Sequence, residues 1–228
     1  MNTNLAELAF ILDRSGSMGC VVQETIAGFN RFLEEQQALP GEARLTLVLF
    51  DTEILTPVDA VPVAAVAPLN HTTYTLGGST ALLDAIGTTI GTIGKRIAAM
   101  PEDQRPGKVI VAILTDGEEN ASRIFTARQI NEMIRHQTDK YAWEFLFLGA
   151  NQDSIATAAR MGIAANNAAN FACNEDSVMA SHASIARKSG AMRMAAMKRA
   201  TTEQLADLEK PTSHIMQEEE TKRREGGK

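Results

Sequence analysis

Short apolar runs that alternate with amphipathic stretches constrain the fold of this chain most strongly. Four runs are almost wholly apolar and of strand length, and they cover Leu5 to Leu12, Leu45 to Phe50, Val109 to Leu114 and Trp143 to Leu148. Such runs are typical of strands buried on both faces of a parallel sheet. Stretches with helical spacing of apolar residues separate them, over 22–39, 81–100 and 126–140. The alternation predicts an α/β fold with a doubly wound, mainly parallel sheet and helices on both faces.

Two weaker runs complete an expected sheet of about six strands. The run from Ile54 to Val58 contains Pro57, which lacks a backbone N–H, so we expect an antiparallel strand at the sheet edge. A sixth strand is expected at 170–172. Beyond it the composition changes, and we divide the chain into an α/β domain at 1–172, a C-terminal helical extension at 173–210 and a charged tail at 211–228. We expect this tail to be disordered or loosely helical.

The composition argues against several classes of partner. The 228 residues carry a net charge of -6, so the chain has no electrostatic footprint for nucleic acid. No apolar run approaches the ~18 residues of a membrane-spanning helix, and the N-terminus lacks the basic charge of a signal peptide. Cys20 and Cys173 make no recognisable disulfide framework, and we expect free thiols. These features favour a cytoplasmic protein without a membrane partner.

Oxygen-bearing side chains gather where the predicted strands end. They come from three loops and comprise Asp13, Ser15, Ser17, Thr80 and Asp116. In open parallel sheets, ligands bind outside the carboxyl ends of the strands, so we expect all three loops at one crevice. Carboxylate and hydroxyl oxygens suit a six-coordinate hard cation. For the first loop alone, the alternative is a strand-to-helix turn whose Asp and Ser side chains cap the next helix.

The same residues resemble the metal-ion-dependent adhesion site of the von Willebrand factor A domains. That pattern is Asp-x-Ser-x-Ser, then Thr, then Asp, and this chain matches it at the five positions just named. The surroundings match as well, with Phe-Ile-Leu-Asp at 10–13, Gly-Gly-Ser-Thr-Ala-Leu at 77–82 and Leu-Thr-Asp-Gly at 114–117. The resemblance covers about Leu5 to Ala172. Residues 147–153 are similar to those of stand-alone cytoplasmic bacterial or phage members.

The resemblance implies a role for each of these residues. Ser15 and Ser17 would bind Mg2+ directly through their hydroxyls, and Thr80 would bind it directly or through a water. Asp13 and Asp116 would act largely through coordinated waters, which leaves the metal electrophilic toward an Asp or Glu side chain of a protein partner. Mn2+ suits the same oxygen set. The implied function is a divalent-metal-dependent protein-interaction module and not an enzyme.

Two other functions are compatible with parts of this pattern. A metal-dependent hydrolase or phosphatase would use an Asp at the end of the first strand, and in this respect Asp13 resembles the haloacid dehalogenases. That pattern requires a second Asp two residues later, where this chain has Ser15, and the motifs contain no His or Lys placed to act as a base. A Gly-x4-Gly-Lys-Ser/Thr phosphate-binding motif is also missing. The resemblance further allows an adaptor subunit of a ring ATPase.

Residues beside the candidate site have two interpretations. Gly78, Gly117, Glu118 and Asn120 are candidates for a partner-binding rim, and the alternative is a set of turn residues on a solvated loop. Asp51 follows another predicted strand and is interpreted as a turn residue. The four histidines show no metal-ligand spacing. The basic, Met-containing helix after residue 181 is expected to pack its Met side chains on the domain, and a partner groove is the alternative.

Overall fold

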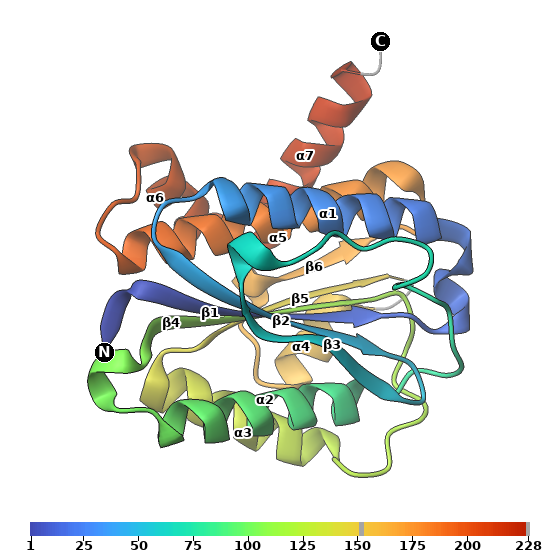
Figure 1. Ribbon diagram of the computed structural model, residues 1–228. Helices are drawn as coiled ribbons and strands as arrows, with labels where there is room; N and C mark the ends of the chain where they lie inside the picture. Colours follow the sequence, from blue (N-terminus) through green and yellow to red (C-terminus); the bar gives the residue numbers. More distant parts are fainter. Residues whose placement is uncertain (151–152, 227–228) are drawn as a thin grey trace.

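The computed structural model describes residues 1–150 and 153–226, which form one six-stranded sheet covered by helices (Figure 1). The sheet has the order β3-β2-β1-β4-β5-β6. Its strands are β1 (Asn2–Asp13), β2 (Glu42–Phe50), β3 (Ile54–Pro62), β4 (Pro106–Thr115), β5 (Glu144–Ala150) and β6 (Ala168–Phe171). Neighbours are parallel except β3, which pairs antiparallel with β2 at the edge. The predicted mainly parallel sheet with one antiparallel edge strand is confirmed.

Helices cover both faces of the sheet. Each face therefore has its own apolar core, and the central strand β1 contributes side chains to both. One face is covered by α1 (Val22–Ala38) and α5 (Glu175–Ala196), and the other by α2 (Leu82–Ala99), α3 (Ala127–Tyr141) and α4 (Ser154–Arg160) (Figure 1). Successive side chains of a strand point to opposite faces. Accordingly Phe10 lies in the apolar cluster on the α1 side and Ile11 in the cluster on the α2 side, both fully buried.

The strand order places the ends of β1 and β4 next to each other. The chain builds β2 and β3 on one side of β1, then crosses to β4 on the other side, so the strand order reverses between β1 and β4. Their register pairs Leu12 with Leu114, which brings Asp13 and Thr115 to the same edge. Ligands of open α/β sheets bind at such reversal points. The fold therefore places the predicted polar loops after β1 and β4 at the same edge of the sheet.

Helix α5 completes the core of the domain and is largely buried. It has 22 residues and is capped at its N-terminus by Asn174, whose side chain accepts a hydrogen bond from the N–H of Ser177. It ends at Ala196, and Lys198 has left-handed backbone with φ 57°. Met192 and Met194 are buried, as expected. Among the described residues, neither α5 nor any other helix is long and apolar enough to cross a membrane.

We expect His182 on α5 to make the fold sensitive to acid. Its ring is 1% exposed and stacks on Phe10, with centroids 5.8 Å apart. Burial lowers its pKa to about 4, while an unfolded histidine titrates near 6.5. The unfolded chain therefore binds an extra proton between these values, so the stability is fully present above about pH 6.5 and declines as pH falls toward 4. The expected loss is about 2–3 kcal/mol.

The measurement is the free energy of unfolding against pH for the wild type and for His182→Gln. Buried carboxylates titrate in the same range, so the informative quantity is the difference between the two chains. That difference should change by about 2–3 kcal/mol between pH 7 and 4. His136→Gln, at an exposed histidine, should follow the wild type. Parallel pH curves for wild type and His182→Gln would contradict the prediction.

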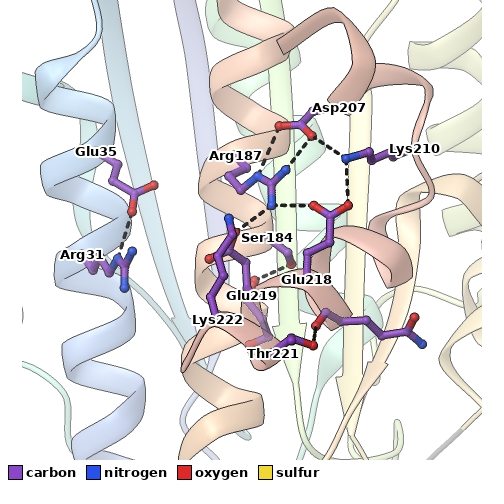
Figure 2. Close-up of polar contacts among 12 residues, drawn as sticks. Arg31, Glu35, Ser184, Arg187, Asp207, Lys210, Glu218, Glu219, Thr221 and Lys222 are labelled. Atoms are coloured by element: carbon purple, nitrogen blue, oxygen red, sulfur yellow. Dashed lines mark hydrogen bonds and ion pairs between the residues drawn. The ribbon is translucent and has the colours of Figure 1, made fainter. Parts of the chain in front are cut away.

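The charged tail forms a docked helix instead of the disordered or loosely helical segment that we expected. Residues after α5 make α6 (Thr202–Glu209) and α7 (Thr212–Gly226), and α7 buries Ile215 and Met216. Arg187 of α5 bonds Asp207 of α6 at 2.6 Å and Glu219 of α7 at 2.7 Å (Figure 2). We expected disorder because charged residues are dense along the tail. The structure differs because these charges are paired with charges of α5 and α6.

Candidate metal centre

The turn after β1 is shaped by its own polar residues. Asp13 ends β1, and its Oδ1 accepts a hydrogen bond from the N–H of Ser15 at 2.7 Å, which closes an Asx turn. The chain then enters the 3-10 turn η1 (Gly16–Val21), which carries Ser17. The N–H of Arg14 donates to Phe50 O at 2.8 Å, which ties the turn to the end of β2. The residues of this turn therefore place Ser15 and Ser17 at the carboxyl end of β1.

The loop that carries Thr80 is held against this turn by Asp51. The N–H of Gly77 donates to Arg14 O at 2.8 Å, and the N–H of Gly78 donates to Asp51 Oδ2 at 2.5 Å. A Cβ on Gly77 would collide with the Asp51 carboxylate, so only glycine allows this approach. Arg14 contacts the other carboxylate oxygen of Asp51 at 2.7 Å. Asp51 is a turn residue, as interpreted, and it also positions the Thr80 loop.

Direct hydrogen bonds join three of the five predicted ligands. Ser17 Oγ donates to Asp116 Oδ1 at 2.7 Å, and Ser15 Oγ and Ser17 Oγ lie 3.1 Å apart. Thr80 Oγ1 lies beside Gly117, since a Cβ on that glycine would be 2.8 Å from it and 3.7 Å from Ser17 Oγ. The oxygens of Ser15, Ser17 and Asp116 thus meet at one point, and the Thr80 hydroxyl lies close to them.

Asp13 joins the group through a neighbour of Asp116. Thr115 Oγ1 donates to Asp13 Oδ2 at 2.5 Å, so the last residues of β1 and β4 are linked by a side-chain bond. Tyr74, which is 1% exposed, donates its hydroxyl to the backbone oxygen of Asp13 at 2.7 Å. Sequence reasoning missed Thr115 and Tyr74. Thr115 could have been found as a hydroxyl at the end of a central strand, whereas nothing in the sequence marks Tyr74.

Burial makes the two carboxylates costly in their charged form. Asp13 is 0% exposed and Asp116 is 2% exposed. Burial raises the pKa of both groups, and the charge of Asp116 raises the pKa of Asp13 further. The Arg14 guanidinium contacts Asp51, whose pKa is held low by N–H donors and Arg14 in spite of burial. A cation between Asp13 and Asp116 would offset their desolvation and their repulsion.

The donor set fits a hard divalent cation. It offers three hydroxyls and two carboxylates, which are the oxygen ligands that Mg2+ and Mn2+ prefer. Within the described part of the chain, no group of three or more His, Cys, Asp or Glu side chains could hold a metal ion. The candidate centre therefore depends on serine and threonine oxygens, and it has no set of nitrogen or sulfur ligands of the kind that structural zinc uses.

The four predicted rim residues have different positions. Asn120 accepts a hydrogen bond from the N–H of Thr80 through its side chain at 2.9 Å, so it positions that residue. The N–H of Gly78 donates to the carboxylate of Asp51, and the carbonyl oxygen of Gly78 accepts a hydrogen bond from the N–H of Gly16. Gly117 lies beside Thr80, and Glu118 is exposed. Of these four, Gly78, Glu118 and Asn120 are exposed, and Gly117 is half-buried.

Glu119 organises the loop after β4, a role that sequence reasoning did not predict. Its carboxylate accepts hydrogen bonds from the N–H groups of Leu83, Ala121 and Ser122, at 2.8 to 3.0 Å. The loop after β4 is thereby attached to the start of α2, which follows Thr80. Asn151 and Gln152, part of the segment that resembles bacterial and phage members, lie outside the described residues.

The comparisons with known proteins concern the fold. No protein-family model matches the sequence, and a search of curated proteins returns no match. Similar solved structures include proximal thread matrix protein 1 from the mussel byssus, with a zinc-occupied MIDAS motif (TM-score 0.56, 14% identity, 84% of this chain and 46% of that chain). A von Willebrand factor type A protein from Catenulispora acidiphila is also similar (TM-score 0.50, 13% identity, 84% and 42%).

A third similar structure is a single domain. It is the vWF domain of the type V pili tip protein Mfa5 from Porphyromonas gingivalis (TM-score 0.55, 11% identity, 80% of this chain and 94% of that chain). The chain thus spans less than half of the first two proteins and nearly all of this domain. At such identities the likeness concerns the arrangement of the backbone. The chain has the fold of a von Willebrand factor A domain.

Proposed function

We propose that this protein is a divalent-metal-dependent protein-interaction module that binds a partner's Asp or Glu carboxylate through Mg2+ or Mn2+. The observation that carries the proposal is the meeting of Ser15, Ser17 and Asp116, joined by hydrogen bonds of 2.7 and 3.1 Å. The sequence resemblance and the zinc-occupied MIDAS motif of the byssus protein support a divalent cation. The resemblance to bacterial and phage members supports a cytoplasmic location.

The neutral and the charged residues of the candidate centre would have different roles in binding the metal. The neutral hydroxyls of Ser15, Ser17 and Thr80 would hold the metal without cancelling its charge. Asp13 and Asp116 would balance the cation from positions that Thr115, Ser15 and Ser17 already fix. When bound, the metal supplies a positive centre for an oxygen ligand from the partner.

Binding suits this arrangement better than catalysis. In the described hydrogen bonds of the five predicted ligands, the partners are hydroxyl, thiol and backbone groups and the side-chain oxygen of Asn120, which accepts from the N–H of Thr80. None of these bonds comes from a His or Lys side chain that could transfer a proton at neutral pH. We therefore propose a non-enzymatic role.

The test is capture of partner proteins on the immobilised full chain with Mg2+, and again after EDTA. Partners that depend on the metal should be retained with Mg2+ or Mn2+ and released by EDTA. Asp116→Asn should capture none of them, while Glu132→Gln, an exposed carboxylate on α3, should capture them all. Partners retained equally in EDTA would contradict the proposal, and Mg2+-dependent turnover of a phosphate ester would favour a hydrolase.

A further inference from the structure

Two thiols from distant parts of the sequence meet beside the candidate metal centre. Cys20 Sγ lies 3.2 Å from Cys173 Sγ. Cys20 lies in η1, the turn that carries Ser17, and Cys173 lies between β6 and α5. The sulfur atoms are in contact, and a disulfide requires them to approach to about 2.05 Å. The fold thus pairs two cysteines that showed no framework in the sequence.

Both thiols contact residues of the candidate centre. The Cys173 thiol is directed at Asp116 Oδ2, 3.7 Å from its sulfur, and Cys20 Sγ lies 3.5 Å from the carbonyl oxygen of Ser17. Asp116 also accepts the Ser17 hydroxyl through its other oxygen. A covalent change at the two sulfurs would therefore act directly on a predicted metal ligand and on the turn that holds another.

The two thiols differ in their access to solvent. Cys20 is exposed, whereas Cys173 is half-buried and packs against the apolar cluster on the α1 side. An oxidant in solution reaches Cys20 first, and Cys173 is the neighbouring thiol that can resolve the product.

We propose that Cys20 and Cys173 form a reversible disulfide that strengthens metal binding at this centre, with hydrogen peroxide as the oxidant. The Cys20 sulfur attacks one peroxide oxygen, the O–O bond breaks, and a sulfenic acid and one water form. The Cys173 sulfur then attacks the Cys20 sulfur, and the hydroxyl leaves with the Cys173 proton as a second water. Two thiols lose two electrons and peroxide gains them. A small dithiol reverses the step.

The direction of the effect follows from the contacts that the disulfide removes and adds. Oxidation removes the S–H donor from Asp116, so more of the carboxylate charge is available to a cation. It also links η1 to the start of α5, which restricts the turn that carries Ser17 before the metal binds and so lowers the entropic cost of binding. The part of the inference that concerns the metal rests on the proposed function.

The experiment compares the full chain after treatment with hydrogen peroxide and after dithiothreitol. We expect a monomer that has lost two hydrogen atoms, with the Cys20 and Cys173 peptides joined in a non-reducing digest. The melting temperature should rise by about 5–10 °C, because the link closes a long loop. The dissociation constant for Mn2+, followed by electron paramagnetic resonance, should fall by about threefold or more. Dithiothreitol should reverse all three changes.

Cys20→Ser is the matched control, because it keeps the Cys173 thiol on Asp116 but cannot form the link. With or without peroxide, it should keep the melting temperature and the Mn2+ affinity of the reduced wild type. Links only between molecules, or sulfinic acid without a link, would overturn the proposal. Equal Mn2+ affinity in both forms would overturn the effect on the metal. A link in a chain that binds no Mn2+ in either form would instead contradict the proposed function.

Discussion

Replacing Asp13 by asparagine is expected to weaken Mn2+ binding by about 100-fold or more while leaving the fold at least as stable. The Asp13 carboxylate is fully buried, and burial and Asp116 raise its pKa, so its charge destabilises the metal-free fold at neutral pH. Asparagine has nearly the same shape and can still accept the N–H of Ser15. The variant removes the negative charge that a bound cation requires. It also removes the cost of burying that charge in the metal-free fold.

Two measurements separate the function from the fold in this variant. Mn2+ titration followed by electron paramagnetic resonance gives the affinity, and urea unfolding without metal gives the stability. The free energy of unfolding should be unchanged or higher by about 1 kcal/mol. Glu118→Gln removes an equal charge from an exposed position near the site, and its Mn2+ affinity should stay within about twofold of the wild type. Wild-type Mn2+ affinity in Asp13→Asn would rule out the assigned role.

Replacing Arg187 by methionine is expected to lower the free energy of unfolding by about 2–4 kcal/mol. This guanidinium bonds Asp207 and Glu219, whose side chains are 6% and 8% exposed (Figure 2). Without it, the ion-pair partner left to each carboxylate among the described residues is a lysine, Lys210 at 3.7 Å for Asp207 and Lys222 at 2.8 Å for Glu219. Lys222 and Arg187 hold the pKa of Glu219 low in spite of burial, so this contribution is present above the ordinary pKa of Glu and is lost in acid.

Hydrogen exchange should locate the loss from Arg187→Met in α6 and α7, because these helices are joined to α5 through this residue. Adding Asp207→Asn to the variant should recover about 1 kcal/mol or more, since one unpaired buried charge disappears. The matched control is Arg31→Met on α1, whose pair with Glu35 is half-exposed (Figure 2). Its expected cost is below about 0.5 kcal/mol. Equal costs for the two arginine variants would refute the prediction.

Much of the fold could be predicted because its central strands are almost wholly apolar. Phe10 and Ile11 point to opposite faces of β1, so both can be buried only if both faces of the strand are covered, and this requirement is visible in the sequence. The edge position of β3 followed in the same way from Pro57. The docking of α7 could not be predicted, because it depends on pairs such as Arg187 with Glu219, 32 positions apart.

The five predicted ligands come from a sequence pattern, and the sheet brings them to one edge. The residues that hold them there were less accessible to sequence reasoning. Asp51 resembles any turn residue until Gly78 is placed against its carboxylate, and Tyr74 shows its role only when its hydroxyl reaches the backbone of Asp13. Such contacts join separate segments, so no local pattern contains them.

The sequence by itself determined which segments are buried strands and which oxygen-bearing residues follow them. Both are visible locally, because a buried strand is a run of apolar residues and the turn after it is marked by its own polar residues. The tertiary structure alone decided which of those residues are adjacent. Strand order places β1 beside β4, so Ser17 reaches Asp116, and the packing of α5 against α1 brings the segment that carries Cys173 to Cys20. These pairs are 99 and 153 positions apart, and only the packing of the whole chain brings them together.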